Sequence, residues 1–522
     1  MHFILSYGGN DVRNKSKRWM GICLLLLTGL VGCSRNEAVE RETGVAAAED
    51  VTEEITEKST ETIRLEAEDA TLTGNMAAEH SKDGYTGEGY VTGMKEDGDT
   101  CIFTVPIDKS GFYDLNFVSA STGGYKENSI LLDGESIGVI TAEKETFTDS
   151  VLSRIYLEAG DHQVEVAKSW GWMDLDSLTV TESAAFDESV FDVSAKLIDE
   201  QADDCAKRLM SYLTDMYGEK VLSGQYSQNG MYGNDMSAIW RVTGGKFAAV
   251  LGLDFMEYSP SRAANGSTSK ATEYAMEFWD KGGIVTFCWH WNVPQKYLKG
   301  TWWKGFYTDS VDIDLATIMN GEDQEGYDLL MQDIDTIAGQ LKILEDHGVP
   351  ILFRPLHEAS GGWFWWGDSG PEAYIKLWKV LYDRITNIHG IHNLIWVWNG
   401  QDKEWYPGDE YVDIIGEDIY PGEKVYTSQI AKFMEALDYT EQRKMIILSE
   451  NGCIPDPELL VRDRAMWGMF GTWSGEFVTK SSNVNIWSDQ YTEEYMVKKA
   501  YEDENVITLD ELPDLKEYPI HD

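Results

Sequence analysis

Basic side chains are scarce in this sequence of 522 residues. It has 43 lysines and arginines against 90 aspartates and glutamates, which gives a formal net charge of −47. A surface of this sign repels phosphate backbones and anionic lipid head groups, so the composition excludes nucleic-acid binding and polybasic attachment to a membrane. A neutral partner is compatible with it. We expect a monomer that acts on such a partner.

Cysteine and proline are also scarce, with 6 and 12 residues. Cys101, Cys205, Cys288 and Cys453 show neither CxxC nor zinc-ligand spacing, so nothing demands a disulfide framework or a zinc site. Hydrophobic residues make up 43% of the chain, which together with the low proline content indicates folded structure over most of its length. The length suits two or three domains.

The N-terminus carries one short apolar run. Gly21 to Gly32 is too short to span a bilayer and follows four basic residues between Arg13 and Arg18, which is typical of a signal peptide over residues 1–32. Leu30-Val31-Gly32-Cys33 resembles the bacterial lipobox, which implies a lipid on Cys33 and an exported, cell-surface or membrane-anchored lipoprotein of a bacterium. A plain signal peptide with an incidental cysteine is the alternative. Residues 33–61, rich in Glu, Thr and Ala, predict an acidic flexible tether.

Residues 62–182 show short alternating segments separated by Gly, Asp and Asn, such as Cys101-Ile102-Phe103-Thr104-Val105 and Val164-Glu165-Val166. Regular turn signals between segments of period two predict an antiparallel β-sandwich of the jelly-roll kind. Trp170, Trp172 and Asn128 are candidates for sugar contact, because an indole stacks on the apolar face of a sugar and an amide bonds its hydroxyls. A tryptophan in the sandwich core is the alternative for either indole.

This region resembles carbohydrate-binding module family 35. The motifs are Glu66-Ala67-Glu68, Gly84-Tyr85-Thr86-Gly87, Gly89-Tyr90-Val91, Leu131-Leu132-Asp133-Gly134 and Trp172-Met173-Asp174-Leu175-Asp176-Ser177-Leu178. The resemblance implies a structural calcium held by Glu66, Glu68 and Asp176, since calcium requires hard oxygen ligands. The alternative is that these carboxylates simply face solvent.

After a linker over residues 183–198, residues 199–522 alternate buried strands with amphipathic helices. The pattern predicts eight strands: Val221 to Tyr226, Phe247 to Phe255, Gly283 to Trp291, Pro350 to Glu358, Leu394 to Trp398, Val412 to Tyr420, Met445 to Glu450 and Met466 to Trp473. Eight strand-helix units predict a C-terminal (β/α)8 TIM barrel. The chain is therefore expected to be multidomain, with a β-sandwich before the barrel.

Polar and aromatic residues gather where the predicted strands end, and 16 of the 19 tryptophans lie between Trp240 and Trp487. Because the carboxyl ends of barrel strands carry catalytic groups, we expect a cleft lined by indoles and carboxylates. Such a cleft suits a neutral polyhydroxylated chain. Glycosidic cleavage needs two carboxyl groups across the bond, and Glu358 and Glu450 close the fourth and seventh strands.

These segments resemble glycoside hydrolase family 26, best known for endo-β-1,4-mannanases, over Gln201 to Tyr518. The specific motifs are Phe287-Cys288-Trp289-His290-Trp291-Asn292, Arg354-Pro355-Leu356-His357-Glu358 with Gly362-Trp363-Phe364-Trp365-Trp366-Gly367, and Ser449-Glu450-Asn451-Gly452. The resemblance implies hydrolysis of mannan, galactomannan or glucomannan by a retaining mechanism without a catalytic cofactor. Glu358 would be the acid/base and Glu450 the nucleophile.

The same resemblance implies further roles. Arg354 and Tyr420 would support the ionised Glu450, His290 and His357 would bind sugar hydroxyls, Trp363 would be a stacking platform, and Asp418 would orient its neighbours. Trp473 joins the substrate-binding candidates because its strand end is aromatic in the family. Partial burial near aromatic walls should raise the pKa of Glu358, which must be protonated before attack.

Several alternatives stay open. Arg354 could be a barrel-core partner for an acid, and His290, His357 and Glu358 could bind a metal. Trp365, Trp366, Trp396 and Trp398 are expected to be packing residues. Other family 26 activities, namely β-1,3-xylanase, mixed-linkage glucanase and chain-end mannobiohydrolase, compete with the endo-mannanase, and the long segment Val293 to Gly326 could either block or extend the cleft. A non-catalytic lipoprotein that captures polysaccharides is a further alternative, although a binder needs neither glutamate.

Overall fold

The computed structural model describes residues 62–481 and 483–521. The predicted signal peptide, Cys33 and the tether lie outside the described residues. Among the residues described, no helix has both the length and the apolar character needed to cross a bilayer.

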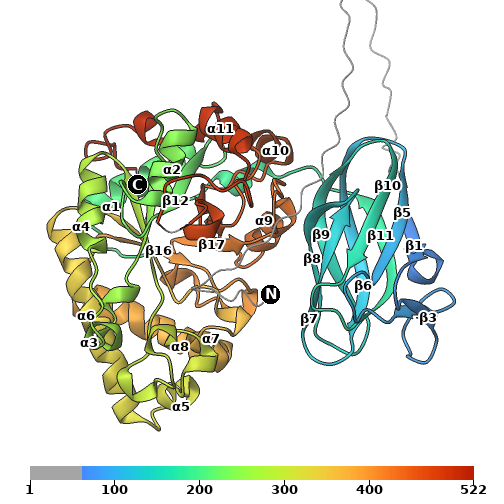
Figure 1. The fold of residues 1–522 in the computed structure, drawn as a ribbon, viewed down its shortest axis with the longest axis horizontal. Helices are drawn as coiled ribbons and strands as arrows, with labels where there is room; N and C mark the ends of the chain where they lie inside the picture. The colour runs from blue at the N-terminus through green and yellow to red at the C-terminus, as the bar shows by residue number, and fades with distance from the viewer. Residues whose placement is uncertain (1–61, 482, 522) are drawn as a thin grey trace, which may run out of the picture. The chain divides into compact units, whose positions relative to one another are not determined.

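The N-terminal domain is an antiparallel β-sandwich of two sheets (Figure 1). One sheet has the order β3-β4-β11-β6-β9, with β1 paired to β11, and the other has the order β2-β5-β10-β7-β8. The strands are β1 Ile63–Glu66, β2 Thr71–Leu72, β3 Ala77–Glu79, β4 Tyr90–Thr92, β5 Thr100–Ile107, β6 Gly111–Ser121, β7 Lys126–Leu132, β8 Glu135–Ala142, β9 Thr148–Leu157, β10 Gly160–Ala167 and β11 Met173–Glu182.

The alternation of apolar and polar residues along each strand decides which of its faces is buried. In β5, Phe103, Val105 and Ile107 are at most 4% exposed, whereas Thr104 and Pro106 between them face solvent. Successive side chains of a strand point to opposite faces, so one row fills the space between the two sheets. The predicted β-sandwich is confirmed.

The C-terminal domain is a closed barrel of eight parallel strands, β12 to β19, because β12 pairs with both β13 and β19. They are β12 Val221–Tyr226, β13 Val250–Asp254, β14 Ile284–Trp289, β15 Ile351–Pro355, β16 Leu394–Trp398, β17 Ile414–Ile419, β18 Met445–Asn451 and β19 Met469–Thr472. All eight predicted strands are present. A ninth strand, β20 Val506–Ile507, pairs with β12 and was not predicted.

Helices cover the outside of the barrel (Figure 1). They are α1 Asp204–Met216, α2 Asn234–Val242, α3 Pro260–Ala264, α4 Ala271–Asp280, α5 Leu315–Met319, α6 Gln324–Asp346, α7 Trp365–Asp368, α8 Pro371–Tyr382, α9 Ile430–Leu437, α10 Pro457–Asp463 and α11 Glu494–Glu502. In α6, Leu330, Ile334, Ile337, Leu341 and Leu344 are fully buried. This spacing of three and four places one apolar stripe against the sheet.

The predicted fourth strand, Pro350 to Glu358, is longer than the observed β15, which ends at Pro355. Leu356 and Glu358 have left-handed backbone conformations, with φ of 52° and 53°. Such conformations are unfavourable for residues with a side chain and end a strand. The chain therefore leaves the sheet just before Glu358.

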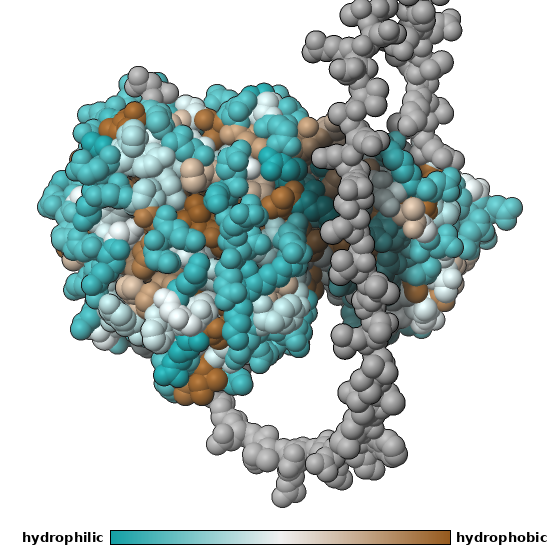
Figure 2. Space-filling view, turned by 90° about the horizontal axis from the view of Figure 1, so that it is seen from above, coloured by the Kyte–Doolittle hydropathy of each residue, from teal (hydrophilic) through white to brown (hydrophobic). Residues whose placement is uncertain are grey.

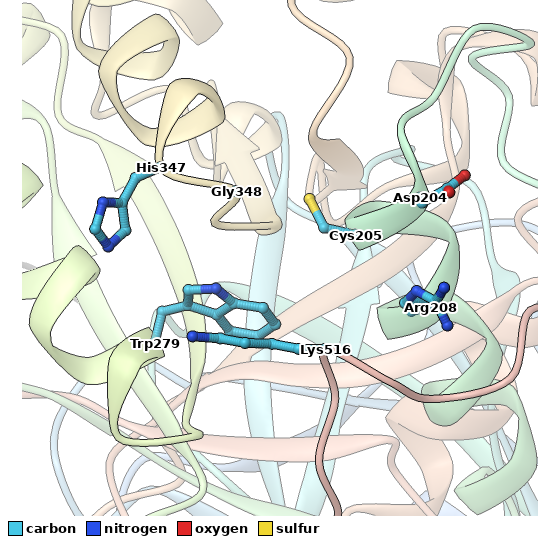
Figure 3. A pocket seen from close by; sticks show the side chains of 7 residues that line it. All are labelled: Asp204, Cys205, Arg208, Trp279, His347, Gly348 and Lys516. Carbon is cyan, nitrogen blue, oxygen red and sulfur yellow. The ribbon is translucent and has the colours of Figure 1, made fainter.

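The visible molecular surface is mostly hydrophilic, with apolar residues in scattered groups (Figure 2). A small cavity lies among residues of α1, α4 and the end of α6, lined by Asp204, Cys205, Arg208, Trp279, His347, Gly348 and Lys516 (Figure 3). Apart from Lys516, which follows the last strand, these residues lie on the segments that lead into β12, β14 and β15. The cavity therefore belongs to the amino-terminal end of the barrel, where barrel enzymes do not place their active sites.

Candidate active site

Glu358, Asp418 and Glu450 lie together at the carboxyl end of the barrel. Each offers a carboxylate oxygen, and these oxygens all lie within 4.8 Å of one another. Asp418 belongs to β17, Glu450 to β18, and Glu358 follows β15. Parallel strands direct their carboxyl ends to one edge, which brings residues far apart in the sequence to one place.

Glu358 stands on a turn that is fixed by its backbone. Its amide N–H donates to the backbone oxygen of Asn399 at 2.7 Å and to Oδ1 of the same residue at 3.1 Å. Its Oε2 accepts a hydrogen bond of 2.8 Å from Trp363 Nε1. Burial, and next the charge of Glu450, raise the pKa of Glu358 to about 7. A carboxyl group with this pKa holds a proton near neutral pH, as a general acid requires.

Glu450 has a different environment, because both of its oxygens accept hydrogen bonds. Tyr420 donates to Oε2 at 2.6 Å, and Arg354 Nη2 donates to Oε1. Glu450 is 3% exposed. Donors on both oxygens, one of them an arginine, fix the orientation of this carboxyl group.

Arg354 links the carboxylates from inside the barrel. It is fully buried, and Nη1 donates to Asp418 Oδ2 at 2.7 Å, while Nη2 also donates to Tyr226 at 3.1 Å. Although burial opposes the charge on Arg354, Asp418 and Glu450 raise the pKa of Arg354 well above its usual range. Arg354 is therefore a barrel-core partner for acids and a support for Glu450 at once, so the two roles that the sequence left open coincide.

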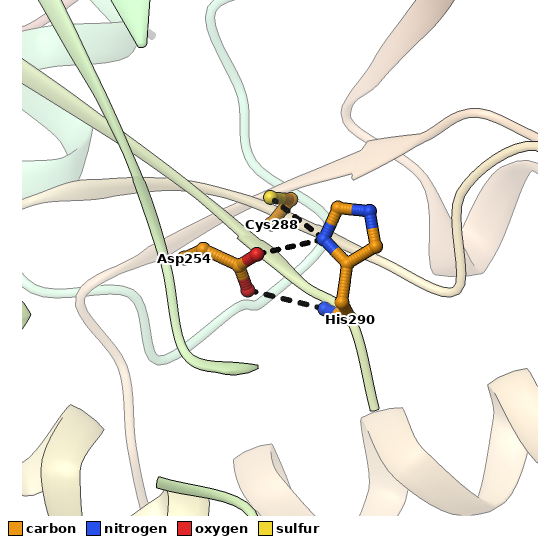
Figure 4. A group of neighbouring side chains, drawn as sticks. All are labelled: Asp254, Cys288 and His290. Atoms are coloured by element: carbon orange, nitrogen blue, oxygen red, sulfur yellow. Dashed lines mark hydrogen bonds and ion pairs between the residues drawn. The ribbon is translucent and has the colours of Figure 1, made fainter. Parts of the chain in front are cut away.

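His290 and His357 form a chain that begins at Asp254. Asp254 Oδ2 lies 2.7 Å from His290 Nδ1, and Asp254 Oδ1 accepts from the His290 amide at 3.1 Å (Figure 4). His290 Nε2 lies 3.3 Å from His357 Nε2. Burial opposes protonation of His290, but the charge of Asp254 outweighs it and raises the pKa of His290. Burial and the charge of Arg354 lower the pKa of His357 well below its usual value, so this ring is neutral.

Two groups of three side chains in residues 62–481 and 483–521 have ligand atoms close enough to share a metal ion. One is Glu358 with Asp418 and Glu450, and the other is Asp254 with Cys288 and His290 (Figure 4). In the first group the guanidinium of Arg354 already forms ion pairs with two of the carboxylates. In the second, Asp254 is engaged by His290. The metal alternative named from the sequence, His290 with His357 and Glu358, is not one of these two groups.

Aromatic side chains line the site and support it. Trp473 contacts Tyr226 and His290, with ring centroids 4.7 and 5.7 Å apart, and Trp363 is 41% exposed. Trp363 is exposed and Trp473 is half-buried, so both indoles can face a ligand. Trp365, Trp366, Trp396 and Trp398 are at most 1% exposed, which confirms them as packing residues.

The sandwich candidates separate into two kinds. Trp170 and Trp172 are 53% and 50% exposed, and Tyr125 packs against Trp170 at 5.7 Å between ring centroids. Asn128 is fully buried, and its Oδ1 accepts from the amides of Ser169 and Gly171. The expectation that Asn128 contacts sugar is wrong for this arrangement, since its amide holds the loop that carries Trp170.

Of the predicted calcium ligands, Glu66 and Asp176 share a neighbour, Thr86, whereas Glu68 bonds other residues. Thr86 Oγ1 donates to Glu66 and Asp176, both at 2.9 Å, and Glu68 Oε1 accepts from the amides of Glu88 and Gly89. Glu68 Oε2 is buried without a hydrogen-bond partner. Glu66, Glu68 and Asp176 do not form one of the two groups of three possible metal ligands described above.

Sequence reasoning missed three residues that hold the site together. Asp254 orients His290, Tyr226 bonds Arg354, and Asn399 bonds the Glu358 amide and, at 3.4 Å, Arg354. Each stands at or next to the end of a predicted strand. Arg354 and Glu450 were selected because they are polar residues near the ends of predicted strands. The same rule, applied to every predicted strand, would also have selected these three residues.

The fold and the site define a glycoside hydrolase. A barrel presents two carboxyl groups at its carboxyl end, with nearest oxygens within 4.8 Å. This closeness agrees with the separation of about 5 to 5.5 Å found in retaining enzymes, because inverting enzymes leave room for a water molecule.

Comparison with known proteins assigns the family. Residues 198–511 match Glycosyl hydrolase family 26, and residues 63–183 match Carbohydrate binding module (family 35). The chain belongs to glycosyl hydrolase family 26, whose members are retaining enzymes that need no cofactor for catalysis.

Its relatives share both domains. The chain is 38% identical over 463 residues to a mannan endo-1,4-β-mannosidase of Thermothelomyces thermophilus, covering 87% of this chain and 92% of the relative. It is 35% identical to mannan endo-1,4-β-mannosidase B of Piromyces sp, covering 86% and 77%. The crystal structure of the GH26-CBM35 β-(1,4)-mannanase of Podospora anserina is similar with a TM-score of 0.60 and 38% identity, over 87% of this chain and 99% of that one.

Proposed function

We propose that this protein is a retaining endo-β-1,4-mannanase that hydrolyses mannan, galactomannan or glucomannan. The observation that carries the proposal is the pair Glu358 and Glu450, whose carboxylate oxygens lie within 4.8 Å in opposite environments. The names of the relatives support the substrate, since both curated relatives above are mannan endo-1,4-β-mannosidases. A β-mannanase that is 31% identical was crystallised with a gluco-manno-oligosaccharide.

The reaction takes two steps. A Glu450 carboxylate oxygen attacks C1 of the sugar, the bond from C1 to the leaving oxygen breaks, and protonated Glu358 gives its proton to that oxygen. In the second step ionised Glu358 takes a proton from water, the water oxygen bonds C1, and Glu450 leaves as a carboxylate. Two inversions at C1 retain the configuration.

The remaining residues bind the sugar and orient the two glutamates. Tyr420 and Arg354 hold Glu450, and Asp418 balances the charge of Arg354. His290, whose charge acts on Glu358, and His357, whose Nε2 lies 3.3 Å from that of His290, are proposed to bind hydroxyls of the sugar at the cleavage point. Trp363 and Trp473 provide apolar faces for stacking.

The test is incubation with mannan, galactomannan, glucomannan, xylan and mixed-linkage glucan, with product length followed over time. An endo-mannanase gives a rapid fall in chain length on the mannans and little release from xylan. Release of disaccharides alone at early times would indicate chain-end action instead. Cleavage of β-1,3-xylan or mixed-linkage glucan in preference to mannan would refute the proposal that mannan is the substrate.

We propose that the sandwich binds polysaccharide through Trp170 and Trp172 and so raises the local substrate concentration. Their exposure supports this, because an indole that packs a core is buried. Trp170→Ala should weaken binding to insoluble mannan while the hydrolysis of short soluble oligosaccharides is unchanged. Phe103→Leu, a change inside the sandwich core, is the matched control for a general loss of stability.

We propose that Glu66, Glu68 and Asp176 hold a structural calcium ion. The unpartnered, buried Glu68 Oε2 supports this, since a buried carboxylate oxygen without a donor is costly. Removal of calcium by a chelator should lower the Tm of the sandwich, and added calcium should restore it. A Glu68→Gln variant should no longer respond to either.

We propose that Cys33 carries a lipid and anchors a monomeric enzyme at the surface of a bacterium. The apolar run before Leu30-Val31-Gly32-Cys33 supports export. Expression in a bacterium with radiolabelled fatty acid should label the wild type and leave Cys33→Ala unlabelled. The molar mass of the protein without residues 1–33, measured by light scattering, tests whether it is a monomer.

A further inference from the structure

The long segment Val293–Gly326 is joined to the chain just after Glu358. The backbone N–H of Thr308 donates to the oxygen of Trp363 at 2.8 Å, and its hydroxyl donates to the oxygen of Gly362 at 2.9 Å. Tyr307 and Phe364 form an antiparallel bridge beside these bonds. Thr308 therefore fixes two consecutive backbone carbonyls of the segment Gly361–Trp363, which we name the Trp363 turn.

The Trp363 turn is shaped to fold its indole back. A Cβ atom on Gly361 would lie 2.0 Å from the ring of Trp363, and Gly362 has a φ of +69°. Only glycine accepts both conditions without strain. The result is the hydrogen bond of 2.8 Å from Trp363 Nε1 to Glu358 Oε2, although the indole is 41% exposed.

The chemistry of this bond distinguishes the two oxygens of Glu358. An indole N–H can donate but never accept, so Oε2 must be the acceptor in every protonation state. In a neutral carboxyl group the carbonyl oxygen is the better acceptor, which leaves the proton on Oε1. When Glu358 is ionised, the same N–H stabilises the carboxylate.

We propose that Thr308 is a positioning residue for the acid/base: through the Trp363 turn it holds the indole N–H against Glu358 Oε2, so that Oε1 delivers and recovers the proton. The inference rests on the proposed role of Glu358 in hydrolysis. It also gives the long segment Val293–Gly326 a function that the sequence left open, since this part of it supports the catalytic carboxyl rather than only blocking or extending the cleft.

Other charges also act on Glu358, and the test must hold them constant. The titratable groups that face it are Glu450, Asp418, Arg354, His290, Tyr307 and Tyr420. None of them is changed in the variants below.

The experiment compares the pH dependence of kcat/KM for wild type, Trp363→Phe, Thr308→Val, Thr308→Ser and the double variant Trp363→Phe/Thr308→Val. Loss of the N–H removes a donor to the carboxylate and so raises the pKa of Glu358. In Trp363→Phe the alkaline limb of the kcat/KM profile should therefore move to higher pH by about one unit. Thr308→Val should move it in the same direction by less, and Thr308→Ser should restore the wild-type limb. The double variant should match Trp363→Phe, because Thr308 acts on Glu358 only through the Trp363 N–H, which that variant already lacks.

Thr317→Val is the matched control, since Thr317 lies in the same segment and its hydroxyl bonds Asp314 at 2.8 Å. It should keep the wild-type profile. An unmoved limb in Trp363→Phe, or in a folded Thr308→Val, would overturn the inference. If Thr308→Val does not fold, Trp363→Phe alone decides whether the N–H acts on Glu358.

The wild type is first assayed on the polysaccharide panel, and the profiles are measured on whichever glycan it cleaves. A failure of the mannan assignment therefore leaves this test intact. The inference is judged only by the movement of the alkaline limb.

Discussion

Removal of the charge on Glu450 should lower the pKa of Glu358. Their carboxylate oxygens lie within 4.8 Å, and two unit charges at that separation repel by about 3 kcal/mol at an effective dielectric constant of about 20. Since about 1.4 kcal/mol corresponds to one pKa unit, Glu450→Gln should lower the pKa of Glu358 from about 7 by about 2 units. Burial, partly offset by the hydrogen bond from Trp363 and the charges of Arg354 and His290, would account for the remaining elevation.

The assay is a titration of the Glu358 carboxyl carbon by ¹³C NMR in protein labelled at glutamate. The signal is assigned by its absence in Glu358→Gln. Glu417→Gln is the matched control, because it also removes a buried carboxyl from the same end of the barrel, but Glu417 pairs with Lys432 of α9 at 3.6 Å. The control should leave the Glu358 titration unchanged.

The result matters because Glu358 must change roles during the reaction. Formation of the covalent intermediate neutralises Glu450, so the same shift should turn Glu358 from acid to base between the two steps. An unchanged pKa in Glu450→Gln would assign the whole elevation to burial and refute this reasoning. In the wild type, kcat/KM should fall above about pH 7 as Glu358 loses its proton.

Three further predictions concern single residues. Glu450→Ala should abolish hydrolysis and keep mannan affinity in affinity electrophoresis, and turnover within about tenfold of wild type would contradict its role as nucleophile. Asp254→Asn should lower kcat/KM by about 10- to 100-fold, because His290 loses a charged hydrogen-bond partner, and an equal loss in Cys288→Ala would point to packing instead. Glu417 is fully buried with its pKa raised to about 7, so the stability it contributes is present below its ordinary pKa of 4.5 and lost as the pH rises through about 7. Glu417→Gln should therefore raise the free energy of unfolding at pH 8 by up to about 3 kcal/mol and leave it unchanged at pH 4; equal effects at both pH values would exclude titration as the cause.

The barrel could be predicted from sequence because its strands carry a local signal. The segments around Ile446-Ile447-Leu448 and Leu394 to Trp398 are apolar on both faces, as parallel strands between helices must be. The positions of Glu358 and Glu450 at strand ends then followed from the architecture. Strand lengths were less accurate, because the left-handed turns at Leu356 and Glu358 leave no mark in an apolar pattern.

Contacts between distant segments could not be predicted in the same way. Asn128 was selected as a sugar ligand because amides bond hydroxyls, but an amide bonds backbone groups equally well, and only the fold shows that Ser169 and Gly171 lie next to it. Thr308 carries no motif, and its importance depends on the Trp363 turn lying beside it. Asp254 was missed although it stands next to the end of a predicted strand.

The two glutamates differ in how the chain holds them, and this difference separates their roles. Glu450 is part of β18, so the sheet fixes its backbone while a cation and a phenol donate hydrogen bonds to its side chain. Glu358 stands outside the sheet on a turn held by Asn399, and its side chain has an uncharged donor in place of a cation. A nucleophile must approach C1 along one direction and stay charged, which suits a residue fixed by a strand. An acid/base must lose one proton and regain one in each cycle, and a directly bonded charged partner would oppose this by favouring one protonation state.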